Sequence, residues 1–495
     1  MVSVAGLTRG TKAGPRLILL ALCVAALAWS LGQTMVLPAF PQLREAFDVD
    51  AAQVAWALTA YLVPAAIFTP VIGRIGDMVG RKRVLIAVLG ILVVGSAVSA
   101  LAPTFGVFIA GRILQGVAGG IFPLCFAIIR EQLPLRKVAP AIGTISALVG
   151  VGGGAGLVIG GVLLDQSSYV GIFWVGALIA LGGATAVAVV VPGSAPGRRT
   201  PIDVPGIVVL GVGLVLPLVA IARANEWGWM SAPVLGLIAA GGAVLALWVR
   251  LQARTEHALV DIRSLGAPPV LMTNMATLMV GVGVFGSFVL TPQLAQTPTS
   301  TGYGVGLSAT GAGLVMLPGS LAMLLAGPAS GALGNRAGNK ISLVTGALVA
   351  AAGLTLLALE HRSVTALLCF SAMLSTGVGF CFAALPNLII EAVSPERTGE
   401  ATGMNALIRQ VGSSVGTQVS AAVLAGSVAS AGGLPTDAGY TLAFLIGALG
   451  AFAAAGVAAF IPVVKFDNRR AGSRWSGAAE ERCSGNASHD LRRRS

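Results

Sequence analysis

The stretch Gly73-Arg-Ile-Gly-Asp77-Met-Val-Gly80-Arg81-Lys82-Arg83 is a short charged turn between two long apolar runs, 52–72 and 84–102. A helix needs about 20 apolar residues to cross the hydrocarbon core of a bilayer, and each run has that length. The turn has tight glycines and sets one carboxylate beside three consecutive cations. This pattern predicts two membrane-spanning helices joined by a short basic loop.

The composition extends this prediction to the whole chain. Of its 495 residues 56% are hydrophobic and only 10% are charged, and its mean hydropathy is +0.88. A soluble domain carries roughly a quarter charged residues, so a water-soluble globular protein is excluded. Disorder is excluded as well, because disordered chains are rich in charge and poor in apolar residues. The five cysteines include no CxxC pair, and with three scattered histidines we expect no metal site and no cofactor.

Fourteen apolar runs are long enough to span a membrane. They lie near 17–37, 52–72, 84–102, 106–130, 139–164, 169–191, 204–222, 233–251, 269–291, 307–329, 341–359, 363–390, 401–425 and 440–463. The sequence therefore predicts an all-α polytopic membrane protein with fourteen transmembrane helices.

Basic residues set the expected orientation of these helices. With the N-terminus inside, 26 of the 31 Lys and Arg fall in inner segments, and only Arg44, Arg223 and Arg362 fall in outer ones. By the positive-inside rule, both termini are then cytoplasmic. The net charge of +12 is thus an orientation signal and does not point to a nucleic-acid partner. The excess of Arg over Lys is typical of GC-rich bacteria, so we expect a bacterial plasma membrane.

The chain also repeats itself. Gly73, Asp77, Gly80 and Lys82 recur as Gly331, Asn335, Gly338 and Lys340 at an offset of 258 residues. Parallel repeats are common in transporters, with the substrate path at their interface; coincidental Gly/Arg turns are the alternative. The repeat predicts five parts. They are a cytoplasmic N-terminus (1–16), an N-terminal six-helix half (17–191), a two-helix insertion with its loops (192–268), a C-terminal six-helix half (269–463) and a disordered basic cytoplasmic tail (464–495).

The 73–83 turn resembles the cytoplasmic signature loop of the major facilitator superfamily, G-x-x-x-D-x-x-G-R-[KR]. Gly73, Asp77, Gly80, Arg81 and Lys82 match its positions. The resemblance implies a major facilitator fold in which Asp77 pairs with a nearby Arg and with a helix N-terminus of the other half. That contact would latch one state of alternating access, and a helix N-terminus attracts carboxylate. The alternative is a plain positive-inside loop.

The fourth run contains Gly111-Arg112-Ile-Leu-Gln115-Gly116, which resembles the R-x-x-Q-G pattern of the family. The resemblance links Arg112 to proton coupling. A buried Arg in a span costs about 2.5–3.5 kcal/mol on insertion scales, so it should face the protein or a water-filled cavity. An Arg that snorkels to the cytoplasmic face is the alternative.

The fifth run carries Gly152, Gly156, Gly160 and Gly161, which resemble the antiporter motif G-x-x-x-G-P-x-x-G-G found mainly in exporters. Leu157 replaces the proline, which puts the kink of that motif in doubt. Small residues let helices approach closely, so generic helix packing is the alternative reading.

Further segments, including Arg397-Thr-Gly399-Glu400 before Arg409-Gln410, resemble the fourteen-helix drug:proton antiporter branch. Members of this branch typically carry L-D-x-T in the first span, but here Gly32 stands in the carboxylate position of Leu31-Gly32-Gln33-Thr34. We find no acidic residue in the middle of any run. The cavity candidates are deep arginines and neutral polar residues. These candidates are Gln33, Thr34, Gln115, Asn274, Gln293, Asn405, Arg409 and Gln410, beside Arg112.

A cavity without a carboxylate is a poor site for a lipophilic cation, because an unpaired ion in low dielectric is costly. We therefore expect a neutral, zwitterionic or anionic amphipathic substrate. The resemblance implies a monomeric secondary transporter that exports drugs or amphipathic small molecules in exchange for protons. The alternative is an uncoupled facilitator or an exporter of an endogenous neutral or anionic metabolite or lipid. No catalytic or phosphate-binding motif is present, so an enzyme is not expected.

Overall fold

The computed structural model describes residues 14–49, 51–166, 168–193, 201, 203–228, 230–255, 258, 260–428 and 434–462. The expected tail (464–495) and most of the expected N-terminal segment (1–16) lie outside these residues. The regular structure of the described part is helical, which confirms the all-α part of the predicted fold class.

The first half of the chain forms eight α-helices and two 3₁₀ turns. They are α1 (Pro15–Thr34), η1 (Leu37–Ala39), α2 (Phe40–Phe47), α3 (Ala51–Val79), α4 (Arg81–Ala100), α5 (Phe105–Val117), η2 (Ala118–Gly120), α6 (Ile121–Gln132), α7 (Leu135–Gln166) and α8 (Tyr169–Val190). The predicted fourth span is thus two helices joined by η2. There the glycines bring the backbone against α3, since a Cβ at Gly119 would lie 2.8 Å from the Cα of Ala65.

In the predicted insertion the described residues form two long helices, α9 and α10, and the short α11, and the remaining elements belong to the second half. In chain order the elements are α9 (Val204–Trp227), α10 (Ala232–Arg254), α11 (Ile262–Leu265), α12 (Pro268–Val284), α13 (Ser287–Gln296), η3 (Thr299–Thr301), α14 (Ala309–Ala337), α15 (Asn339–Leu359), α16 (Val364–Ala392), η4 (Pro395–Arg397), α17 (Thr398–Gly426) and α18 (Asp437–Ala459).

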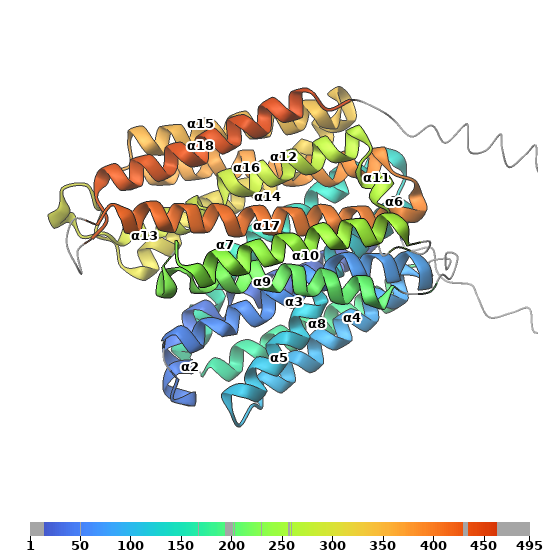
Figure 1. The fold of residues 1–495 in the computed structure, drawn as a ribbon, viewed down its shortest axis with the longest axis horizontal. Helices are drawn as coiled ribbons and strands as arrows, with labels where there is room; N and C mark the ends of the chain where they lie inside the picture. The colour runs from blue at the N-terminus through green and yellow to red at the C-terminus, as the bar shows by residue number, and fades with distance from the viewer. Residues whose placement is uncertain are drawn as a thin grey trace, which may run out of the picture.

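The long helices run roughly parallel to one another (Figure 1). Helices α2–α5 and α8 of the first half lie in the lower part of the view, and α12, α15, α16 and α18 of the second half, in yellow-green to red, lie in the upper part. The two halves meet where α3 contacts α17 and where α7 contacts α14. Helices α9 and α10 pack against each other, and α9 also contacts α3.

Hydroxyl and carboxyl side chains cap several helices at their N-termini. Thr104, Ser308, Ser363 and Thr436 each accept a hydrogen bond from the backbone amide three residues ahead, and so does Asp203 before α9. Such caps satisfy amides that have no partner within the helix. They explain why long apolar segments begin at these positions.

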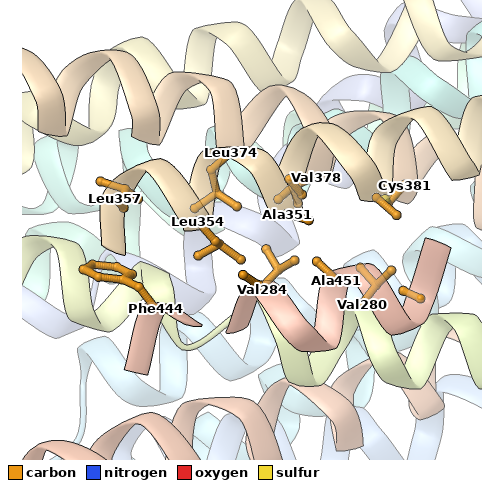
Figure 2. Packing of buried hydrophobic residues seen from close by; sticks show 14 of the residues in the cluster. Val280, Val284, Ala351, Leu354, Leu357, Leu374, Val378, Cys381, Phe444 and Ala451 are labelled. Carbon is orange, nitrogen blue, oxygen red and sulfur yellow. The ribbon is translucent and has the colours of Figure 1, made fainter. Parts of the chain in front are cut away.

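Each side of the bundle has its own apolar core. In the second half, α12, α15, α16 and α18 interlock through small and branched side chains, as Figure 2 shows. Leu354 and Val378 are almost fully buried there, and Val284 faces them from α12. Separate clusters fill the first half around α1, α4 and α6. Two units that are each tightly packed, and that meet along only a few helices, are suited to move relative to each other as rigid bodies.

Twelve helical segments of the described residues are long and apolar enough to cross a membrane. Helix α17 is not among them. In α9 the described stretch Val204–Pro217 counts as a shorter apolar helix. Helix α17 can carry polar residues because it buries Glu400 and Asn405 against other helices and not against lipid. The prediction of a multi-pass membrane protein is confirmed, and the two remaining spans stay a prediction.

Candidate functional site

The candidate site begins at the end of the bundle where α3 finishes and α4 starts, here called the latch end. Gly80 joins the two helices with a φ of 113°, and its repeat partner Gly338 joins α14 to α15 with a φ of 98°. Only glycine adopts such angles without strain. The two copies of the repeat therefore turn the chain in the same way.

Asp77 connects the two sides of the bundle. Its Oδ1 accepts hydrogen bonds from Nε and Nη2 of Arg81, at 3.0 Å and 2.9 Å. Its Oδ2 accepts one from the backbone amide of Glu400 at 3.1 Å, in the first turn of α17. A carboxylate at this place also meets the partial positive charge of the helix N-terminus.

Two arginines extend this contact. Arg81 donates from Nη2 to the carbonyl of Pro395 at 2.6 Å. Arg130, at the end of α6, donates to Thr398 Oγ1 at 2.6 Å and to the carbonyl of Val393 at 3.0 Å. We call Asp77, Arg81 and Arg130, with η4 and the first turn of α17, the latch. Arg130 could not be predicted from the sequence, because its partners are backbone and hydroxyl groups that leave no motif.

Glu400 joins a third part of the chain to the latch. Its carboxylate accepts from Arg74 Nη1 at 3.0 Å and from the backbone amide of Asp261 at 2.7 Å. Asp261 pairs with Arg397 and accepts hydrogen bonds from the backbone amides of Arg263 and Ser264 in α11. Burial acts to raise the pKa of Asp261, but these donors and the Arg397 charge outweigh it and hold that pKa below its ordinary value. Asp261 is therefore ionised at neutral pH.

The glycines of the turn allow α3 and α17 to cross at contact distance. A Cβ at Gly73 would lie 2.3 Å from the carbonyl oxygen of Gly399. Lys82 is not part of this contact. Its Nζ donates to the carbonyl of Ala188 at 2.8 Å, near the end of α8.

Arg112 lies fully buried in the first half of the bundle. Its Nε donates to the carbonyl of Ala57 at 2.8 Å, and its Nη1 donates to Gln115 Oε1 at 2.6 Å. Gln115 in turn donates to Ser96 Oγ at 2.7 Å. Within the described residues, Arg112 Nη2 has no hydrogen-bond partner. Arg112 is thus held in place by α3, α4 and α5, with one donor left over.

Gly32 lies directly beside this guanidinium. Its carbonyl accepts from Arg112 Nη1 at 3.2 Å, and the guanidinium carbon lies 4.5 Å from the centre of the Tyr61 ring. The guanidinium of Arg112 is therefore in contact with a backbone carbonyl and a ring face. No carboxylate of the described residues forms an ion pair with Arg112.

The second half contributes a different polar group. Asn405 donates to Asn274 Oδ1 at 2.9 Å and to Thr277 Oγ1 at 2.7 Å, which ties α17 to α12. One turn further along α17, the half-buried Arg409 stacks on Phe382, with its guanidinium carbon 4.6 Å from the ring centre. No described carboxylate pairs with Arg409 either.

Within the described part of the chain, the side chains of the other predicted cavity residues form no hydrogen bond to these groups. Thr34 donates to the carbonyl of Gly152 at 2.6 Å, so its hydroxyl serves helix packing. Gln33 and Gln410 are half-buried, and Gln293 is exposed on α13. The structure thus brings Arg112 together with Gln115, and Asn274 with Asn405, but it does not gather all the candidates into one cluster.

The glycines of α7 differ in what they contact. A Cβ at Gly152 would lie 2.5 Å from Ser30 Cβ, one at Gly156 would meet Thr34, and one at Gly160 would lie 2.5 Å from the Met35 carbonyl oxygen. A Cβ at Gly161 would meet nothing within 4 Å. Three of the four glycines therefore permit close packing of α7 on α1.

This difference gives a matched pair of substitutions. Gly152→Ala should lower the melting temperature, because overpacking a tight contact costs about 1–3 kcal/mol. Gly161→Ala, in the same helix, should leave it unchanged or raise it, since Ala is favoured over Gly in a helix by about 0.5–1 kcal/mol. Thermal unfolding of the two purified variants in one detergent measures both effects. Equal melting temperatures would contradict the packing role of Gly152.

The model of the Major Facilitator Superfamily matches residues 18–417 and 305–484. The chain belongs to this superfamily. It is 31% identical over 438 residues to an MFS-type transporter of Mycobacterium tuberculosis, covering 85% of this chain but only 62% of that relative's length. It is 29% identical over 432 residues to the tetracenomycin C resistance and export protein of Streptomyces glaucescens, covering 85% and 78%.

Solved structures of the superfamily share this fold. The crystal structure of the human organic anion transporter MFSD10 aligns with a TM-score of 0.64 at 17% identity, covering 90% of this chain and 99% of the other. The fold and the relatives are those of superfamily transporters and not of enzymes.

Proposed function

We propose that this protein is a secondary active transporter that exports drugs or other amphipathic small molecules across the bacterial plasma membrane by alternating access. The observation that carries the proposal is the hydrogen bonding of Asp77 to both Arg81 and the first turn of α17. It fixes the two sides of the bundle at one end. A transporter needs such a contact to be broken and remade as the path opens alternately.

The orientation and the span number form part of the proposal. The latch end carries the conspicuous excess of basic residues, so we place it, and both termini, in the cytoplasm. We count fourteen spans by adding α9 and α17 to the twelve apolar segments. Helices α9 and α10 then form a two-helix insertion (192–268) between six-helix halves at 17–191 and 269–463. We treat the chain as a monomer in the lipid bilayer.

Proton-coupled antiport is the favoured mechanism. Asp77 is the carboxylate at the contact between the halves, and Arg112 offers a buried donor without a partner. Because Gly32 replaces the first-helix carboxylate, coupling would use these two groups or protonation of the substrate itself. The absence of that carboxylate equally favours the alternative, an uncoupled facilitator or an exporter of an endogenous neutral or anionic metabolite or lipid.

The substrate class follows from the charges of the buried residues. Arg112 and Arg409 are paired with carbonyl oxygens or rings, and the polar residues near them are neutral. An uncompensated cation in such surroundings would be costly. We therefore expect neutral, zwitterionic or anionic amphiphiles. The similarity to the tetracenomycin C resistance and export protein supports drug export by this chain.

Purified protein in liposomes tests the proposal. An imposed pH gradient should drive uptake of neutral and anionic amphiphiles into liposomes that carry inverted protein, and collapsing the gradient should stop it. Ethidium, a cation, should be moved poorly. A substrate flux that does not depend on the pH gradient would support the uncoupled alternative. Rapid ethidium transport would contradict the proposed substrate class.

A further inference from the structure

A cavity of about 350 Å³ lies at the latch end, beside the latch but outside it. It is bounded by the end of α10, by the segment that follows α10, by α3 and by the start of α17. Its lining residues include Arg74, Gln252, Arg254, Asp261, Arg263, Arg397 and Glu400. We call it the α10–α17 cavity. Glu400 belongs to both features, since its amide binds Asp77 and its side chain lines the cavity.

The charges that line the α10–α17 cavity do not balance. Of the lining residues that the structure describes, four carry guanidinium groups and two carry carboxylates. Glu400 pairs with Arg74, and Asp261 pairs with Arg397. Arg254 and Arg263 form no ion pair with a carboxylate of the described residues. Among the described lining residues two positive charges are thus in excess, on arginines that line the cavity and are exposed to solvent.

The walls of the cavity are held by buried hydrogen bonds. Gln252 is buried; its amide nitrogen donates to Asp203, and its Oε1 accepts from the amide of Val260 at 3.1 Å. Trp248 Nε1, one turn earlier on α10, donates to the carbonyl of Gly206 at 2.9 Å. These bonds fix the end of α10 to α9 and to the segment that leads into α11. The arginines therefore project from a preorganised frame.

We propose that the α10–α17 cavity binds a phosphate-type anion, either free phosphate or the phosphate headgroup of a lipid, and that the bound anion favours the closed latch. A dianion with several acceptor oxygens matches two free guanidinium groups, whose planar donor pairs suit phosphate better than single point charges do. The volume lies within the range of pockets that hold small ligands, about 300–1,000 Å³.

The cavity is coupled to the latch because its lining residues come from both sides of the latch contact. Arg74 comes from α3, whereas Arg397 and Glu400 come from the chain at the start of α17. Opening the latch would separate α3 from α17 and take the cavity apart. A ligand that binds only one state favours that state, by about tenfold when its concentration is ten times Kd. This coupling rests on the proposed alternating access, whereas binding itself does not.

Binding is tested on the full-length protein. Native mass spectrometry measures how much short-chain phosphatidic acid remains bound to the wild type and to Arg254→Gln/Arg263→Gln. We expect binding to be at least about tenfold weaker in this variant, since each lost hydrogen bond was made to a charged group. The matched control is Arg83→Gln/Arg250→Gln, which removes two exposed charges near the same end but outside the cavity.

Coupling is tested by distance measurements in nanodiscs of neutral lipid. Spin labels are placed at Leu135→Cys, at the start of α7, and at Ala337→Cys, at the end of α14, after the native cysteines are replaced by alanine. Phosphatidic acid is added in one arm and inorganic phosphate in another. Either should shift the wild type and the control toward the shorter distance, and should leave Arg254→Gln/Arg263→Gln unchanged.

Each outcome has a defined meaning. A response to phosphatidic acid alone identifies the lipid headgroup as the source, and a response to inorganic phosphate as well identifies a free anion. Equal binding by the wild type and Arg254→Gln/Arg263→Gln would overturn the site, and so would equal losses in this variant and its control. Retained binding without a distance shift would overturn the coupling. One fixed distance under every condition, including saturating substrate, would refute alternating access, while the binding comparison would still stand.

Discussion

Asp77→Asn should abolish most gradient-driven transport while the protein still reaches the membrane. Asparagine keeps the shape of the side chain but removes the charge that binds Arg81 and the Glu400 amide. A hydrogen bond to a charged group contributes about 1.5–3 kcal/mol, which is roughly a 10- to 150-fold change in an equilibrium constant. We expect the initial rate of export from proteoliposomes to fall by at least about tenfold. The Leu135–Ala337 label distance should shift toward its longer population.

Glu131→Gln is the matched control for this prediction. Glu131 also contacts Arg81, at 3.3 Å, but it is more exposed than Asp77 and lies on the same side of the bundle as Arg81. Exposed ion pairs contribute about 0–1 kcal/mol, so this variant should transport at close to the wild-type rate. Wild-type transport and an unchanged distance distribution in Asp77→Asn would refute the role of the latch.

The sequence predicted the parts of the latch that depend on local spacing. Asp77 and Arg81 are four residues apart across the Gly80 turn, so their short separation along the chain keeps them close, and the loop pattern supplied the expectation of a partner helix. The sequence did not predict that Arg130 belongs to the latch, nor the role of Glu400 there. Their partners lie more than 130 residues away and include backbone carbonyls, which carry no residue identity.

The same holds for the fold: features that depend on one segment were predicted, and features that depend on contacts between helices were not. Apolar length predicted almost every membrane segment, because hydrophobic thickness acts on each run by itself. The run 401–425 was predicted as a span, but α17 is not among the twelve long apolar segments of the described residues, because its polar residues are satisfied by other helices, as Asn405 is by Asn274 and Thr277. The placement of Lys82 on the α8 carbonyl, and not near Asp77, likewise depends on packing between helices. Tertiary contacts of this kind are not encoded in spacing along the chain.

Arg409→Gln should remove transport of anionic substrates and spare neutral ones. Arg409 is half-buried on α17, stacks on Phe382 and has no carboxylate partner among the described residues. A charge kept in a membrane span at a cost of about 2.5–3.5 kcal/mol calls for a function. If it pairs with a substrate anion, its removal costs about 2–5 kcal/mol of binding, or at least tenfold in kcat/KM. The melting temperature of the Arg409→Gln variant should not fall, since the variant no longer carries the cost of placing a charge in the membrane.

Two further variants separate charge from stacking. Arg409→Lys keeps the charge and should retain most anion transport, whereas Phe382→Leu keeps the arginine but removes the ring beneath it. A cation–π contact contributes about 0.5–2 kcal/mol, so Phe382→Leu should lower anion transport by about 2- to 30-fold. Neutral substrates in the same liposomes serve as the internal control. If Arg409→Gln slowed neutral and anionic substrates equally, Arg409 would be a residue of the helix interface and not the group that recognises the substrate's charge.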